Sequence, residues 1–221
     1  MKNLTRRDLL TQGLRVSALA GTGLVGTELT GMDGLGNHPS TQGKLKVVVA
    51  GAHPDDPETG CGGTIARYSD QGHEVAILYL TRGEAGIRDK SHQEAAAIRT
   101  AEALKACAIL NARPVFVGQI NGDAEVNPHR YADFQRILEA EKADLVFTHW
   151  PLDTHRDHRV ISLLVYDAWL ALGKKFALYF FEVLSGAQTS HFWPTHYVDI
   201  TATESRKRAA CFAHTSQNPD E

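Results

Sequence analysis

Residues 45–58, LKVVVAGAHPDDPE, join a short apolar run to an abrupt block of polar residues. The run LKVVVAG at 45–51 is continuous and β-branched, which is typical of a strand buried on both faces of a parallel sheet. Behind it, AHPDDPE at 52–58 brings a histidine and two adjacent aspartates to the end of that strand. Adjacent carboxylates repel each other, and Pro54 and Pro57 are expected to keep them out of a helix. The stretch therefore indicates either a solvated turn or a site for something positively charged.

Short apolar runs and amphipathic segments alternate along the rest of the chain. The pattern predicts strands at 45–51, 73–81, 114–118, 143–149, 176–183 and 195–201, and helices at 62–72, 91–110, 129–142, 157–172 and 204–214. Strands separated by helices favour βαβ units. We therefore predict a single α/β domain, a Rossmann-like three-layer sandwich with a mostly parallel sheet. Ligands of such sheets bind at the carboxyl ends of the strands, near the switch in strand order.

The composition limits the classes of function. A net charge of −3 on 221 residues gives no sign of a nucleic-acid partner, which would need a basic face. The three cysteines, Cys61, Cys107 and Cys211, are widely spaced and fit neither a disulfide framework nor a zinc knuckle. We expect them to be buried, small apolar residues. The composition does not predict an oligomeric state.

The N-terminus differs from the rest of the chain. Residues 1–10 read MKNLTRRDLL, and a short apolar stretch rich in small residues follows. Paired arginines before such a stretch resemble a twin-arginine export signal, and the alternative is a disordered basic N-terminus. We predict an export signal at 1–30, a linker at 31–43 and the folded domain at 44–221. The protein would then be periplasmic or extracellular in a bacterium, with signal cleavage and membrane retention left open.

Two polar clusters follow the first and the fourth predicted strands. The first contains His53, Asp55, Asp56 and Glu58, and the second, THWPLDTHRDHRV at 148–160, contains His149, Asp153, His155, Asp157 and His158. Zinc binds imidazole nitrogen and carboxylate oxygen, and a hydrolytic zinc site usually has three protein ligands. His53 and Asp56 could bind one ion together with a histidine of the second cluster. A remaining acid could act as general base, and a remaining histidine could stabilise an oxyanion.

Three motifs resemble the PIG-L/LmbE-like family of zinc-dependent N-deacetylases. They are AHPDDPETGCGGTIA at 52–66, TRGEAGIR at 81–88 and HWPLDTHRDHRV at 149–160. The closing KRAACFAHTSQ at 207–217 is similar to the last helix of that family, so the resemblance spans about residues 45–217. Members of the family remove acetyl groups from N-acetylglucosamine-type amino sugars and their conjugates. In some members a glutamate directly follows the second aspartate, whereas here Pro57 intervenes before Glu58.

The resemblance implies a role for nine residues. The implied zinc ligands are His53, Asp56 and His158, with Fe²⁺ as the alternative metal. The implied catalytic residues are Asp55 as general base, His155 at the amide carbonyl or oxyanion, and Asp157 as the carboxylate that orients a histidine. The implied substrate-binding residues are Arg99, Asp123 and Glu84. For Arg99 an ordinary helix-surface ion pair with Glu102 is an equal alternative.

The resemblance implies an exported zinc-dependent hydrolase that removes the N-acetyl group from an N-acetylglucosamine-type sugar or its conjugate. One alternative is an amidase that acts on a larger sugar-thiol or glycolipid amide. Another is a non-catalytic carbohydrate-binding domain, against which the presence of Asp55 argues. A nucleotide-binding Rossmann domain is disfavoured because the chain lacks its glycine fingerprint.

Overall fold

The central sheet has five strands, all of them parallel. The computed structural model describes residues 43–184 and 187–219. Its strands are β1 (Lys46–Gly51), β2 (Glu74–Tyr79), β3 (Arg113–Phe116), β4 (Leu145–His149) and β5 (Ala177–Phe181). Their order in the sheet is β3-β2-β1-β4-β5. The predicted α/β fold with a parallel sheet is confirmed.

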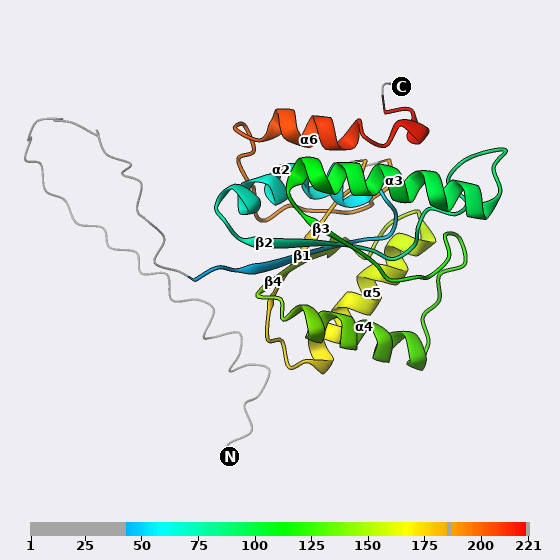
Figure 1. Ribbon diagram of the computed structural model, residues 1–221. Coiled ribbons are helices and arrows are strands. Elements are labelled where there is room, and N and C mark those ends of the chain that lie inside the picture. Colours follow the sequence, from blue (N-terminus) through cyan, green and yellow to red (C-terminus); the bar gives the residue numbers. More distant parts are fainter. Residues whose placement is uncertain (1–42, 185–186, 220–221) are drawn as a thin grey trace, which may run out of the picture. The chain divides into compact units, whose positions relative to one another are not determined.

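Helices cover both faces of this sheet and make a three-layer sandwich (Figure 1). One layer consists of α2 (Asp56–Asp70), α3 (His92–Leu110) and α6 (Glu204–Cys211), and the other of α4 (Pro128–Glu141) and α5 (Arg156–Ala171). A short 3₁₀ helix, η1 (Thr215–Gln217), follows α6. The predicted single-domain sandwich is confirmed for the described residues.

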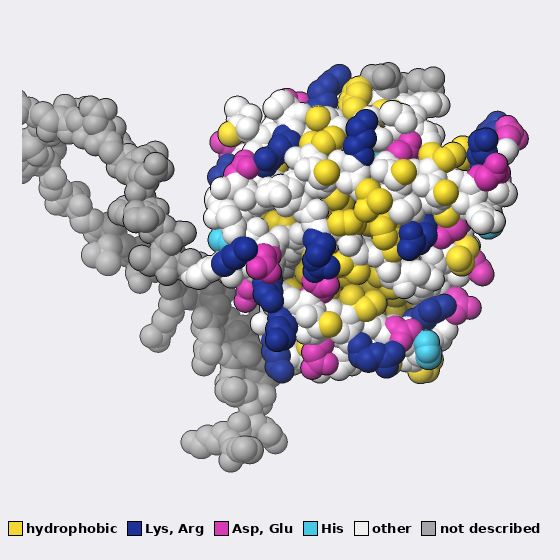
Figure 2. Space-filling model, viewed as in Figure 1, with side chains coloured by type: hydrophobic (Ala, Val, Ile, Leu, Met, Phe, Trp, Pro, Cys, Tyr) yellow, Lys and Arg dark blue, Asp and Glu magenta, His cyan; other side chains and the backbone are white. Residues whose placement is uncertain are grey.

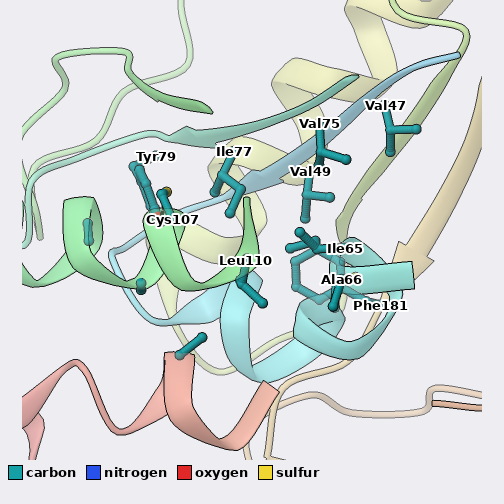
Figure 3. Packing of buried hydrophobic residues seen from close by; sticks show 14 of the residues in the cluster. Val47, Val49, Ile65, Ala66, Val75, Ile77, Tyr79, Cys107, Leu110 and Phe181 are labelled. Carbon is teal, nitrogen blue, oxygen red and sulfur yellow. Dashed lines mark hydrogen bonds between the residues drawn. The ribbon is translucent and has the colours of Figure 1, made fainter. Parts of the chain in front are cut away.

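The apolar run of β1 contributes to two hydrophobic cores. Val47 and Val49 point to the layer of α2, α3 and α6, where they pack in one cluster with Ile65 and Leu110 (Figure 3). Val48 points to the other face and packs against side chains of α4 and α5. Successive side chains of a strand alternate between faces, so a strand between two helical layers must be apolar at every position.

Two predictions of secondary structure were wrong: the start of one helix and the presence of one strand. Helix α2 begins at Asp56 rather than at residue 62, and Pro57 lies in its first turn. The N–H groups of a first turn have no partner within the helix, so the missing N–H of a proline costs no hydrogen bond there. The prolines therefore do not keep both aspartates out of a helix. The predicted strand at 195–201 does not form: Tyr197 is 84% exposed, and no residue of 187–219 joins the sheet. A strand there would lack a buried face.

The predicted export signal, and all of the predicted linker except Gly43, lie outside the described residues. Among the described helices, none combines the length and the hydropathy that a membrane span requires. On the face of the domain shown in Figure 2, Lys and Arg side chains are interspersed with acidic ones, and hydrophobic side chains reach the surface between them.

The strand order places the two polar clusters next to each other. β1 pairs with β4 in the centre of the sheet, from Val47 opposite Leu145 to Ala50 opposite Thr148. The chain turns to opposite sides from these two strands, so the switch in strand order lies between them. The loops that leave their carboxyl ends therefore flank the crevice in which such folds bind ligands.

Candidate metal and catalytic site

Three ligand atoms from the two loops converge at this crevice. The distance from His53 Nδ1 to Asp56 Oδ2 is 3.1 Å, and that from His158 Nε2 to the same oxygen is 3.2 Å. The two histidine nitrogens are 3.3 Å apart. All three residues are buried. The structure thus brings together the three residues that the sequence predicted as metal ligands.

The triangle that these atoms make fits a tetrahedral zinc ion. Zinc binds nitrogen and oxygen at about 2.0–2.2 Å, so ligand atoms at two corners of the tetrahedron should be roughly 3.3–3.5 Å apart. The three observed separations, 3.1, 3.2 and 3.3 Å, are close to that edge length. His53, Asp56 and His158 are therefore spaced as one face of a metal tetrahedron.

Each of the two histidines has a carboxylate on its other ring nitrogen. His53 Nε2 lies 3.1 Å from Asp157 Oδ2, and His158 Nδ1 lies 3.2 Å from Asp153 Oδ1. Such carboxylates fix the tautomer and the ring direction of metal-binding histidines. Asp157 thus lies where the sequence predicted a carboxylate that orients a histidine, and Asp153 does the same for the second ring.

The electrostatics of the cluster favour positive charge. Burial alone would lower the pKa of His53, but hydrogen bonds to Asp157 and Asp56 outweigh it and raise this pKa to about 9. Burial alone would raise the pKa of Asp56, but His158 and His149 hold it well below its usual range. The carboxylates of the site therefore retain a positive partner at neutral pH, as expected of a cation site.

His149, at the end of β4, offers a second grouping with Asp56 and His158. Its Nε2 lies 3.4 Å from Asp56 Oδ2, but the backbone N–H of Ala52 also donates to this nitrogen, at 3.2 Å. A nitrogen that accepts a hydrogen bond has its lone pair occupied. This contact favours His53 over His149 as the third ligand.

Asp55 adopts an unusual backbone conformation beside these ligands. Its φ of 113° lies in a region that L-residues rarely occupy. Its Oδ2 accepts a hydrogen bond from Arg99 Nη2 at 2.7 Å. Burial and the neighbouring charge of Asp56 raise the pKa of Asp55 to about 6, although Arg99 acts in the opposite direction. A carboxylate with a pKa near neutrality suits a general base.

His155 caps the N-terminus of α5 and faces the same cluster. Its Nδ1 accepts a hydrogen bond from the backbone N–H of Asp157 at 3.2 Å, so a neutral ring carries its proton on Nε2. Burial and the neighbouring rings of His53 and His158 lower the pKa of His155. Its ring centroid is 4.6 Å from that of His53. His155 is therefore a neutral hydrogen-bond donor at the edge of the site.

The three predicted substrate residues have different environments. Arg99 is buried and binds Asp55 and the carbonyl of Pro54, so the alternative of a surface ion pair with Glu102 was wrong. Glu84 is buried and accepts hydrogen bonds from the backbone of Arg82 and of Asn121. Asp123 is exposed on the loop after β3. The structure thus brings Arg99 to the loop that follows β1, with Glu84 supporting the loop that carries Asp123.

Sequence reasoning missed part of this site. Asp153 was in the second cluster but received no role. Its position five residues before His158 in the same cluster was the feature of the sequence that could have indicated one. Gln188 was not singled out; its Nε2 lies 3.3 Å from His158 Nδ1. His214 lies buried 3.4 Å from Glu58; it belongs to the closing stretch KRAACFAHTSQ, but it received no role.

Comparison with known proteins identifies the family of this chain. Residues 48–169 match the family described as GlcNAc-PI de-N-acetylase, PIG-L. The diacetylchitobiose deacetylase of Thermococcus kodakarensis is 29% identical over 192 residues, which are 80% of this chain and 71% of that protein.

Two solved structures are also similar. The conserved protein TT1542 of Thermus thermophilus has a TM-score of 0.68 at 30% identity, covering 78% of this chain and 80% of that one. The N,N'-diacetylchitobiose deacetylase of Pyrococcus horikoshii has a TM-score of 0.66 at 26% identity, covering 78% and 71%. The resemblance found in the sequence motifs is confirmed, and the chain belongs to the PIG-L family of de-N-acetylases.

Proposed function

We propose that this protein is a zinc-dependent hydrolase that removes the N-acetyl group from an N-acetylglucosamine-type sugar or its conjugate. The observation that carries the proposal is the triangle of His53, Asp56 and His158 with Asp55 beside it. Three ligands and one spare carboxylate are the parts that metal-assisted amide hydrolysis needs. The similarity to two diacetylchitobiose deacetylases supports the substrate class.

Each residue of the site would have one task. His53, Asp56 and His158 would hold zinc, which supplies a Lewis acid that lowers the pKa of water and polarises the acetamide carbonyl. Asp55 takes a proton from the attacking water and returns it to the amine as the amide C–N bond breaks. His155 donates from Nε2 to the carbonyl oxygen as negative charge develops there. The products are acetate and the free amino sugar.

The sugar itself would be bound by the loops around this centre. Asp123 is exposed, and Arg99 approaches the site from α3 with a guanidinium group that carries several N–H donors. Glu84 holds the backbone of Asn121, two residues before Asp123. We propose Arg99 and Asp123 as partners of sugar hydroxyls and Glu84 as the residue that fixes their loop. An amide larger than acetamide remains the alternative substrate of the same residues.

Substitution of Asp55 tests the function. Asp55→Asn should lower kcat for acetate release from N,N'-diacetylchitobiose by about 10²–10⁴-fold, because general-base catalysis contributes that much. Zinc content, measured by elemental analysis, should stay at the wild-type value. Asp56→Ala should lose both zinc and activity. A wild-type protein that binds the sugar without releasing acetate would instead be a carbohydrate-binding domain, and Asp55→Asn that retains full kcat would exclude Asp55 as the base.

We also propose that the protein is exported through its N-terminal segment. The support is the pair Arg6 and Arg7 ahead of a short apolar stretch. Residues 1–43 fused to a reporter should direct it out of the bacterial cytoplasm, and replacing both arginines by lysine should abolish this although the charge is unchanged. Export of the double-lysine fusion at the wild-type level would contradict a twin-arginine signal.

A further inference from the structure

A buried polar network lies behind the catalytic loop and takes no part in the mechanism described so far. It consists of Glu58, Tyr79 and His214, with exposed fractions of 0%, 0% and 1%. Glu58 is in the first turn of α2, Tyr79 is the last residue of β2, and His214 follows α6. Burying a carboxylate is unfavourable unless partners compensate it. Two distant parts of the chain, β2 and the segment after α6, supply those partners for Glu58.

Both oxygens of the Glu58 carboxylate are in use. Tyr79 donates its hydroxyl hydrogen to Oε1, and His214 Nε2 lies 3.4 Å from the same oxygen. Burial, followed by the charge of Glu58, raises the pKa of Tyr79 well above its usual value, so the hydroxyl keeps its proton. Figure 3 shows Tyr79 beside Cys107 of α3, and the Tyr79 hydroxyl is 3.3 Å from the Cys107 sulfur. The Oε1 side of Glu58 is thus anchored in the core.

The other oxygen of Glu58 reaches the catalytic loop. Oε2 accepts a hydrogen bond from the backbone N–H of Asp55 at 3.2 Å. Asp55 is the residue with a φ of 113°, a conformation that persists only where the surrounding structure holds it. The peptide of Asp55 is therefore tied, through a single carboxylate, to β2 and to the segment after α6.

We propose that Glu58 and Tyr79 are positioning residues for deacetylation, which hold the backbone of Asp55 so that its carboxylate meets the attacking water. His214 lies against the same oxygen of Glu58 as the Tyr79 hydroxyl. The inference rests on the proposed function, because it takes Asp55 as the general base. A helix cap alone would need only the contact between Glu58 and the Asp55 N–H. The Tyr79 hydroxyl makes no contact with the Asp55 N–H and, within Glu58, bonds only to the other oxygen, so this hydroxyl is the part of the network that distinguishes the two roles.

Tyr79→Phe removes that hydroxyl and leaves the ring in place. We expect kcat for acetate release from N,N'-diacetylchitobiose to fall about tenfold or more, because misplacement of a reacting group by 1 Å can cost about 100-fold. KM should stay within about twofold, since the change affects the chemical step rather than binding. Zinc content should equal that of wild type. Tyr68→Phe is the matched control, because Tyr68 lies on α2 outside the network, packed on His73 and Phe147.

A pair of substitutions at Glu58 gives a second readout. Glu58→Gln keeps an oxygen that can accept from the Asp55 N–H, whereas Glu58→Ala removes it. The glutamine variant should therefore retain more of the wild-type kcat than the alanine variant, at equal zinc content. Equal kcat in both would overturn the proposal, as would a loss of kcat in Tyr79→Phe that is matched by a loss of zinc.

Asp55→Asn, assayed in parallel, separates the role of Asp55 as general base from the positioning role of Glu58 and Tyr79. If Asp55→Asn is inactive while Tyr79→Phe and Glu58→Ala keep the wild-type kcat, Asp55 is the base but the network does not position it. If Asp55→Asn itself keeps the wild-type kcat, the proposed role of Asp55 fails first. Loss of kcat in all three variants, with zinc retained, is the result that the proposal requires.

Discussion

At Asp153 a single carboxylate binds three partners. Its Oδ1 accepts from the backbone N–H of His155 at 2.8 Å and lies 3.2 Å from His158 Nδ1. Its Oδ2 accepts from the hydroxyl of Thr189 at 3.0 Å. This arrangement leaves Asp153 no freedom to rotate, so the ring of His158 is held with Nε2 towards Asp56.

We therefore predict that Asp153→Asn weakens metal binding. The amide has one acceptor oxygen where the carboxylate has two, and loss of such an outer partner costs about 10–100-fold in metal affinity. Zinc affinity would be measured by competition with a chromophoric chelator. Asp133→Asn, in an ion-pair cluster on α4, is the control and should bind zinc as wild type does. Unchanged affinity in Asp153→Asn would show that His158 needs no carboxylate.

Single residues also show where prediction from the sequence stops. The positions of His53, Asp56 and His158 could be predicted because a strand end and a family motif coincide at each loop. The partner of Arg99 could not, because a spacing of three residues suggested Glu102, whereas the actual partner, Asp55, is 44 residues away. Contacts between distant segments depend on the packing of α3 against the sheet, which no local pattern encodes.

Helix α2 packs closely against its neighbours at its glycines. A Cβ added at Gly63 would lie 2.6 Å from the side chain of Ile200, and one at Gly62 would lie 2.9 Å from Lys207 Cγ. Ile200 is β-branched and held in the interface with α2, while the long side chain of Lys207 can rotate away. A methyl group at Gly63 would thus meet a side chain that cannot move, whereas one at Gly62 would meet a side chain that can.

Gly63→Ala should therefore destabilise the protein by about 1–3 kcal/mol, the usual cost of overpacking. Gly62→Ala should be neutral or slightly stabilising, because alanine favours a helix by about 1 kcal/mol over glycine. Urea unfolding of both variants measures the difference. If the two variants unfold at the same urea concentration, the contact with Ile200 does not limit how closely α2 packs.

At the level of elements, the strands were predicted best where burial is complete. The apolar runs of β1, β2 and β4 lie between two helical layers, so their continuous apolar sequence directly indicates strands that are buried on both faces. The segment 195–201 also contains β-branched and aromatic residues, yet Tyr197 and Val198 are exposed. Its β-propensity could not be realised because strand formation depends on a neighbour and a buried face, and propensity alone supplies neither.

For the whole molecule, the prediction that the cysteines are buried holds for Cys61 and Cys107, while Cys211 is only partly buried. Burial raises the pKa of both Cys61 and Cys107 to about 12. At pH 8 only about one such thiol in 10⁴ is ionised, and the thiolate is the reactive form. We expect a thiol reagent to modify at most one cysteine of the native protein at pH 8, and all three after unfolding in urea. Rapid modification of two or more in the native state would contradict this packing.

The pairing of β1 with β4 has a consequence for folding. The two halves of the candidate metal site are about a hundred residues apart in the chain and meet only when these strands lie side by side. A bound ion would act as a reversible crosslink, closing a long loop that the unfolded chain leaves open. At a free zinc concentration of 1,000 times Kd the native state would gain about 4 kcal/mol. The fraction of molecules with bound zinc would then report the fraction in which β1 and β4 are paired. Removal of zinc by a chelator should lower Tm.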